Sequence, residues 1–204
     1  MPSAYAVVIG VEKYHSSDIK NVNHARADAE AVRDLLTQRL SVATANVTLL
    51  LDENAHKLEI EEQLQNRIKA LDPDGRFYFF YAGHGMWANG RNRLTAWDTK
   101  ISDLGKTTVD VQKALLNPLR DSGCKQSLMF VDACATEIFV NEDDRDLVSD
   151  MDRKEFEQFI SESEYTAAFL PVRLRRNRIR PRPWGTASGP ITFWRHCAAK
   201  KRRP

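Results

Sequence analysis

Long hydrophobic runs are missing from this sequence, and no stretch of its 204 residues approaches the ~20 apolar residues that a membrane-spanning helix needs. Near its start there is no basic stretch followed by an apolar run and a small-residue cleavage site, so we expect no secretory signal. The three cysteines are too few for a disulfide framework, which favours a reducing, cytoplasmic compartment. With 42% hydrophobic residues, the chain can still build one domain with a sizeable core.

Acidic residues are absent from residues 171–204, which contain eleven Lys and Arg and five of the eight prolines. The preceding residues, 1–170, hold 19 Lys and Arg against 28 Asp and Glu. An acidic body of net charge −9 is therefore followed by a tail of net charge +11. We place a boundary at Pro171, between a domain of residues 1–170 and a separate basic tail.

Short apolar runs alternate with helical patterns along residues 1–170. Unbroken apolar runs predict strands buried on both faces, whereas apolar residues three or four positions apart predict helices packed on a core. The expected strands are residues 4–11, 47–51, 76–82, 127–131 and 165–170. The expected helices are residues 23–40, 109–119, 152–163 and one that Asn54 caps, with the core stripe Ile60, Leu64, Ile68 and Leu71. This alternation predicts an α/β sandwich with a mainly parallel sheet.

Reactive side chains follow two of these expected strands. His84 stands between two glycines after the aromatic strand, and Cys134 follows strand 127–131. The carboxyl ends of parallel strands meet at one edge of a sheet, so both side chains are expected there. An imidazole can take the proton of a thiol, and the backbone N–H groups of Gly85 and Cys134 can stabilise an oxyanion. The alternative is a buried structural cysteine and a histidine in a turn.

Two motifs carry a family resemblance. YAGHG at 81–85 and DAC at 132–134 resemble the His and Cys motifs of caspase-like cysteine peptidases: caspases, metacaspases and bacterial caspase homologues. His84 and Cys134 are 50 residues apart, which matches the caspase spacing. VVIGVEKY, NHARADAEAV and EYTAAFL extend the resemblance over roughly residues 4–170. It implies a caspase-like α/β/α sandwich and proteolysis without metal or organic cofactor, with Cys134 as nucleophile and His84 as general base and acid.

The position two residues before Cys134 bears on specificity. Caspases that cleave after Asp have Gln there, whereas this sequence has Asp132, as metacaspases that cleave after Arg or Lys do. Asp28 resembles a second acidic pocket residue of that branch. Two carboxylates suit a guanidinium, so we expect protein or peptide substrates cut after Arg or Lys. The alternatives are a structural hydrogen bond for Asp132 and a solvated helix position for Asp28.

Other polar residues are assigned no chemistry. Cys124 and Cys197 lack a base at a comparable strand end, and Asp98 is given a structural role. The acidic run 141–157 lacks a spacing typical of calcium ligands, so no metal site is expected. Surface or turn positions are expected for the remaining histidines, His15, His24, His56 and His196. With basic specificity, the sites of self-cleavage would be Arg145, Arg153 and Lys154.

The basic tail leaves three interpretations open: an arm that binds nucleic acid or acidic lipid, a disordered tail, or the product of a frameshift. With freely chosen codons, one shifted frame of residues 171–204 encodes AKSYP and then GHGIWTDHILAALRGEEAP. The second piece resembles the closing segment and helix of bacterial caspase homologues. We favour a frameshift near the codon of Leu170, which would remove that helix and expose apolar surface on the body.

The leading hypothesis is therefore a cysteine endopeptidase with a Cys134–His84 dyad. An inactive or unstable truncated caspase homologue and a non-catalytic interaction module with the same fold are the alternatives. We expect no specific nucleic-acid partner and no membrane partner, and the sequence leaves the oligomeric state open.

Overall fold

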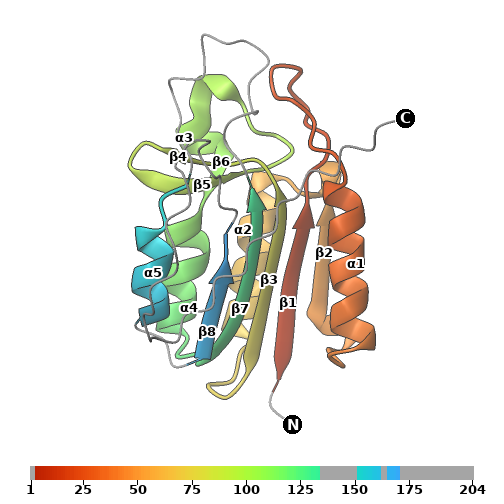
Figure 1. The fold of residues 1–204 in the computed structure, drawn as a ribbon, viewed down its shortest axis with the longest axis vertical. Coiled ribbons are helices and arrows are strands. Elements are labelled where there is room, and N and C mark those ends of the chain that lie inside the picture. The colour runs from red at the N-terminus through yellow and green to blue at the C-terminus, as the bar shows by residue number, and fades with distance from the viewer. Residues whose placement is uncertain (1–2, 134–150, 162–164, 171–204) are drawn as a thin grey trace, which may run out of the picture. The chain divides into compact units, whose positions relative to one another are not determined.

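The computed structural model describes residues 3–133, 151–161 and 165–170, which form a central sheet with helices on both faces (Figure 1). Five strands lie in the order β2-β1-β3-β7-β8, and every neighbouring pair is parallel. Their bounds are β1 Ala4–Gly10, β2 Val47–Leu51, β3 Arg76–Gly83, β7 Gln126–Ala133 and β8 Tyr165–Phe169. The predicted α/β/α sandwich with a mainly parallel sheet is confirmed.

Apolar residues on both faces of β1 explain its place inside the sheet. Val7 and Ile9 belong to the core on one face, Ala6 and Val8 belong to the core on the other, and all four are fully buried. β-Branched and small side chains of this kind fit a strand that is covered on both sides. The unbroken apolar run of the sequence therefore identified this strand correctly.

Helix α1, Ala25–Gln38, covers one face of the sheet beside β1, β2 and β3. The contact is close at Gly10, where a Cβ would lie 2.6 Å from the carbonyl oxygen of Ala25 and 2.9 Å from the Cβ of Ala29. Such distances leave no room for a larger residue, so Gly10 sets how near the helix approaches the end of β1.

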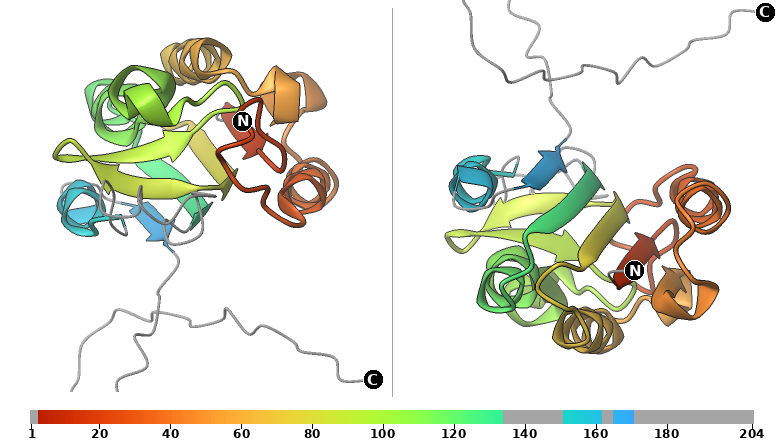
Figure 2. Two further views of the ribbon diagram at one scale, coloured as in Figure 1. Left: turned by 90° about the horizontal axis from the view of Figure 1, so that it is seen from above. Right: turned by 90° about the horizontal axis from the view of Figure 1, so that it is seen from below.

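The opposite face is covered by α2 (Lys57–Lys69), α4 (Asn117–Asp121) and α5 (Lys154–Ser161), as the views along the strands show (Figure 2). The buried side chains that these helices contribute are Ile60, Leu64, Ile68, Leu119, Phe156 and Phe159.

Among the described residues, no helix is both long enough and apolar enough to cross a membrane.

The prediction that Asn54 caps α2 is wrong. Asn54 ends a short 3-10 helix, η2 (Asp52–Asn54), and α2 begins at Lys57. The N–H of Lys57 donates to Oδ1 of Asp98, 2.9 Å away. A carboxylate from a distant segment therefore satisfies the first turn of the helix, and this contact gives Asp98 the structural role expected of it.

Residues 85–110 form a three-stranded antiparallel sheet that the sequence analysis missed. Its strands are β4 Gly85–Ala88, β5 Arg91–Thr95 and β6 Thr108–Asp110, in the order β4-β5-β6. Asn89 and Gly90 both have positive φ, 53° and 70°, as a two-residue hairpin turn requires. The dipeptide Asn-Gly was the available signal for this hairpin.

The predicted helix 109–119 starts too early, because Val109 and Asp110 pair with β5 in the small sheet. The helical segment begins with η4, Gln112–Leu116, and continues into α4. The remaining short elements are η1 Thr44–Asn46, η3 Ile101–Asp103 and α3 Leu104–Thr107. Residues 171–204 lie outside the described part of the chain, so the boundary at Pro171 and the origin of the tail stay predictions.

On the face that α1 covers, none of the helices in the described ranges packs over β7 and β8. In the register of β3, β7 and β8, Tyr78 is aligned with Leu128 and Ala167. In the next row Phe130 is aligned with Phe169, and their rings stack with centroids 4.7 Å apart. We call these five side chains the uncovered face.

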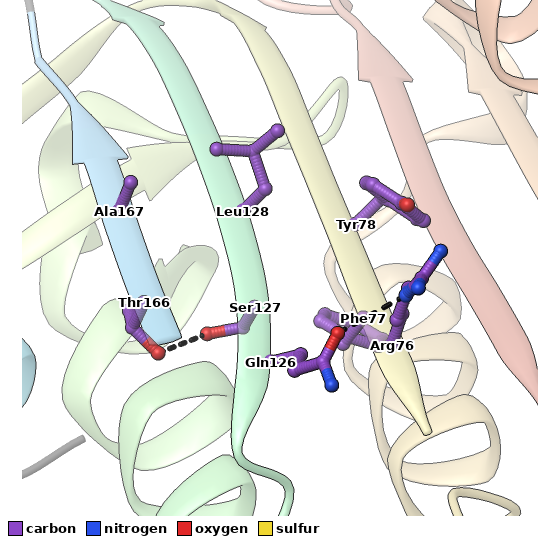
Figure 3. Close-up of a pocket in the computed structure, with 8 residues that line it drawn as sticks. All are labelled: Arg76, Phe77, Tyr78, Gln126, Ser127, Leu128, Thr166 and Ala167. Carbon is purple, nitrogen blue, oxygen red and sulfur yellow. Dashed lines mark hydrogen bonds between the residues drawn. The ribbon is translucent and has the colours of Figure 1, made fainter. Parts of the chain in front are cut away.

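At the amino-terminal ends of β3, β7 and β8, the uncovered face continues into a groove (Figure 3). His84 lies at the opposite ends of these strands. The groove is bordered by two polar contacts. Nε of Arg76 donates to Oε1 of Gln126 at 3.1 Å, and the hydroxyls of Ser127 and Thr166 are 2.9 Å apart. Leu128 and Tyr78 supply its apolar surface.

Candidate active site

The register of β3 and β7 brings the two motif positions together. Gly83, the last residue of β3, is aligned with Ala133, the last residue of β7. His84 and Cys134 directly follow these two aligned residues. The sheet thus places both positions at the carboxyl ends of adjacent strands. Cys134 itself lies outside the described residues, so its pairing with His84 stays a prediction.

The imidazole of His84 is buried, with 5% of the residue exposed, and its orientation is fixed. Its Nε2 lies 2.7 Å from the carbonyl oxygen of Lys20. A carbonyl oxygen only accepts hydrogen bonds, so Nε2 carries a proton, and in the neutral ring Nδ1 holds the lone pair. The ring also stacks on Tyr14, with centroids 5.4 Å apart and 25° between the planes. This tautomer suits a general base that works through Nδ1.

The backbone of His84 is held from both sides. Its N–H donates to the hydroxyl oxygen of Tyr14 at 3.1 Å. Its carbonyl oxygen accepts from the N–H of Thr95 at 3.0 Å and lies 2.8 Å from the hydroxyl of Tyr81. Burial raises the pKa of Tyr14 to about 12 and raises the pKa of Tyr81 well above its ordinary value. Both phenols therefore stay protonated at neutral pH and keep the turn in one conformation.

Gly85 allows the histidine turn to approach the end of β7. A Cβ at Gly85 would lie 2.6 Å from the Cβ of Ala133 and 2.8 Å from Sδ of Met151. No other residue fits between these atoms without moving them. Gly85 thus lies against the residue that precedes Cys134. The expected role of the Gly85 and Cys134 N–H groups toward an oxyanion stays a prediction.

Asp132 and Asp28 come together at the same edge of the sheet. Asp132 is the penultimate residue of β7, and Asp28 lies in the first turn of α1. Both residues are exposed to solvent. Partial desolvation by the surrounding protein and, secondarily, the negative charge of Asp28 raise the pKa of the Asp132 carboxyl. The two carboxylates predicted to receive a basic side chain are thus close enough to repel each other.

Asp52 supports this edge and was missed by the sequence analysis. The residue is 95% buried with a positive φ of 44°, and its Oδ1 accepts from the N–H groups of Glu12 and Lys13 at 2.9 and 3.0 Å. Its Oδ2 lies 3.4 Å from Nη1 of Arg26. Asp52 therefore anchors the loop that follows β1 and leads to Tyr14. The available signal was an aspartate at the end of an apolar strand, whereas Asp132 was marked by its place in the DAC motif.

The other residues considered in the sequence analysis have no assigned part in the proposed chemistry. Burial raises the pKa of the Cys124 thiol, whose Sγ lies 3.4 Å from the carbonyl oxygen of Gln126, as suits a non-catalytic cysteine. The surface positions predicted for three histidines are confirmed, since His15, His24 and His56 are exposed. Lys154 begins α5, and Arg153 immediately precedes it. The predictions for Cys197, His196 and Arg145 concern residues outside the described ranges.

Metal-ligating residues do not gather anywhere in the described ranges. There, no group of three or more His, Cys, Asp or Glu side chains could hold a metal ion. The site described above therefore consists of an oriented imidazole, a glycine turn and a pair of carboxylates. Together with the position of Cys134, these are the groups that the predicted thiol-dependent acyl-transfer site requires.

Comparison with known proteins identifies the family. The model of the caspase domain, peptidase family C14, matches residues 3–188, and the chain belongs to this family of cysteine peptidases. The match extends past Leu170, into the segment predicted to be a separate tail. A search of curated proteins finds no match.

Solved structures are similar in fold. Protein GSU0716 from Geobacter sulfurreducens is 21% identical with a TM-score of 0.52, over 65% of this chain and 51% of that chain. The protein pro-sf-caspase-1 is 18% identical with a TM-score of 0.46, over 65% of this chain and 46% of that chain. The present chain thus spans about half the length of each of these relatives.

Proposed function

We propose that this chain is a cysteine endopeptidase that hydrolyses peptide bonds with Cys134 as nucleophile and His84 as general base. The observation that carries the proposal is the orientation of His84 at the end of β3, one residue beyond the Gly83–Ala133 pair. Membership of the caspase-domain family supports protein or peptide substrates.

The proposed reaction uses the lone pair on Nδ1 of His84. This nitrogen accepts the proton of the Cys134 thiol, and the thiolate attacks the carbonyl carbon of the scissile peptide. The resulting oxyanion would receive hydrogen bonds from the N–H groups of Gly85 and Cys134. His84 then returns its proton to the leaving amine, and the carbonyl oxygen of Lys20 stabilises the imidazolium in the interval. Water, deprotonated by His84, hydrolyses the acyl-enzyme and regenerates the thiol.

Basic specificity is proposed from the charges at the same edge of the sheet. Asp132 stands two residues before the nucleophile, and its pKa responds to the charge of Asp28. A substrate guanidinium or ammonium placed between the two carboxylates would replace repulsion by attraction. We therefore propose cleavage after Arg or Lys, with Arg preferred because its planar group binds carboxylates in pairs.

The experiment compares fluorogenic peptides that end in Arg, Lys or Asp with wild-type protein and three variants. Cys134→Ala and His84→Ala are expected to abolish release of the fluorophore from the Arg peptide. Cys124→Ala removes a thiol away from the site and is the matched control, with activity expected to equal wild type. Equal signals from wild type and Cys134→Ala would remove the peptidase proposal, and faster hydrolysis of the Asp peptide would remove the basic specificity.

A further inference from the structure

The hairpin of β4 and β5 contains a buried amide that the proposed chemistry does not use. Asn92, on β5, is fully buried. Its Nδ2 donates to the carbonyl oxygen of Asp152 at 2.6 Å and to Oε2 of Glu155 at 2.9 Å, while its Oδ1 accepts from the N–H of Asp152 at 2.8 Å. One side chain thus satisfies both backbone groups of a residue 60 positions away. We call this contact the Asn92 clasp.

The Asn92 clasp lies next to the histidine turn. Met151 precedes Asp152, and its Sδ lies 2.8 Å from the point that a Cβ on Gly85 would occupy. The Cβ of Ala133 lies 2.6 Å from the same point. Met151 and Ala133 therefore both pack against Gly85, the residue after His84. Beyond the clasp, Phe156 and Phe159 of α5 anchor the segment in the core.

We infer that Asn92 is a positioning residue of the peptidase site, which acts by holding Met151 against Gly85 and Ala133. This inference rests on the proposed function for its catalytic part. The clasp fixes the distance between the turn that carries His84 and the end of β7 that carries Cys134. A misplacement of about 1 Å between reacting groups can cost on the order of a hundredfold in rate, so such a support matters. Asn92 itself touches neither substrate nor nucleophile in this arrangement.

The charges around the clasp explain why an amide stands at this position. Nδ2 of Asn92 donates hydrogen bonds to two groups that can only accept them, the Asp152 carbonyl and the Glu155 carboxylate. Nη1 of Arg91 lies 3.9 Å from Oε1 of Glu155, and Asp110 contributes a second negative charge. Burial raises the pKa of Glu155, against the hydrogen bonds from Asn92 and the charge of Arg91, which lower it. A carboxylate in place of the Asn92 amide would face these acceptors with nothing to donate.

Asn92→Asp therefore tests the inference with an isosteric change. At about pH 8 the new carboxylate repels Glu155 and the Asp152 carbonyl, and we expect kcat for the Arg peptide to fall by about tenfold or more with KM within about twofold of wild type. Acidification to about pH 5.5 should recover part of the loss relative to wild type, because protonation restores a donor. Adding Glu155→Gln should restore kcat at the higher pH, since its amide donates to the introduced carboxylate.

A second readout does not depend on activity. The chain has four methionines, and Met86 and Met129 are fully buried, Met86 in a different core cluster from Met151. In protein labelled on the methionine methyl groups, Met151→Leu assigns the Met151 signal. Asn92→Asp is expected to move this signal toward that of an unfolded chain at about pH 8 and to leave the Met86 and Met129 signals in place. The Glu155→Gln addition should return it.

The outcomes separate this inference from the proposed function. An Asn92→Asp protein with unchanged kcat across the pH range, or with an unmoved Met151 signal, overturns the inference. If the Met86 and Met129 signals also collapse, Met151→Ala replaces the variant, and an unchanged kcat there overturns the inference equally. A wild type without Cys134-dependent hydrolysis overturns the proposed function and the catalytic role of Asn92, while a shifted Met151 signal would still establish the clasp.

Discussion

In the proposed substrate site, the single residue Asp132 affects both substrate binding and the stability of the fold. Its raised pKa means that the folded protein binds the carboxyl proton more tightly than the unfolded chain does. Stability is therefore lost as the pH rises from the ordinary pKa of an aspartate through the raised pKa of the folded state. Ionisation of Asp132 is unfavourable for folding, whereas the proposed basic specificity needs the ionised carboxylate.

We expect KM for the Arg peptide to rise as the pH falls through the raised pKa of Asp132, because the neutral carboxyl attracts a guanidinium weakly. Asp132→Asn should have a high KM that is insensitive to pH in this range and should be more thermostable than wild type at neutral pH. Steady-state kinetics and thermal unfolding at a series of pH values measure both effects. A wild-type KM that stays constant over the range, or an Asp132→Asn protein with the wild-type KM, would argue against a role in specificity.

Among single residues, the sequence pointed to those that lie in motifs. It did not reveal the residues whose role depends on partners far away in the chain. His84 and the two aspartates were found because each follows a strand or lies in a family motif. The partners of Asp52, Tyr14 and Asn92 are 40, 70 and 60 residues away along the chain. No local pattern encodes such contacts, although they hold the histidine turn and the Met151 segment in place.

The start of α2 shows how one element depends on another. The N–H of Lys57 donates to Asp98, which lies between β5 and β6 of the small antiparallel sheet. We expect Asp98→Ala to lower the free energy of unfolding by about 1 kcal/mol, because the helix loses its N-terminal acceptor. Asp98→Asn keeps an oxygen at Oδ1 and serves as the matched control, with a smaller loss. Urea unfolding followed by circular dichroism measures the difference, and equal stability of the two variants would show that the cap contributes nothing.

Periodicity predicted the elements whose buried residues are apolar and failed where they are polar. In β1 and β3 nearly every buried residue is apolar, so the sequence pattern was clear. In β5, Asn92 and Arg93 are buried, and Arg93 is satisfied by the carbonyl oxygens of Ala88 and Gly105 at 3.2 and 3.1 Å. Hydropathy treats both as surface residues, which concealed the strand despite the Asn-Gly turn beside it.

On the uncovered face, two neighbouring aromatic side chains of the central sheet are left exposed. Phe80 is buried on this side of the sheet, whereas Phe130 and Phe169 expose 38% and 40% of their surfaces. A contiguous exposed apolar patch on a sheet marks an interaction surface or a tendency to aggregate. Apolar exposure was expected from the sequence if a closing helix is lost, while the frameshift near Leu170 stays a prediction.

A chain with the shifted frame restored after Leu170 tests that hypothesis through the same two phenylalanines. If the restored segment covers this face, Phe130→Ser with Phe169→Ser should destabilise the restored chain by about 1–3 kcal/mol or more, because the substitutions then remove buried contacts. In the chain with the present tail, the same pair should have little effect on stability and should reduce self-association and binding of an apolar dye. Urea unfolding and light scattering of the four proteins distinguish the cases. An equal loss of stability in both backgrounds would mean that the restored segment does not cover the face, and an unchanged reading frame in the sequenced locus would remove the frameshift itself.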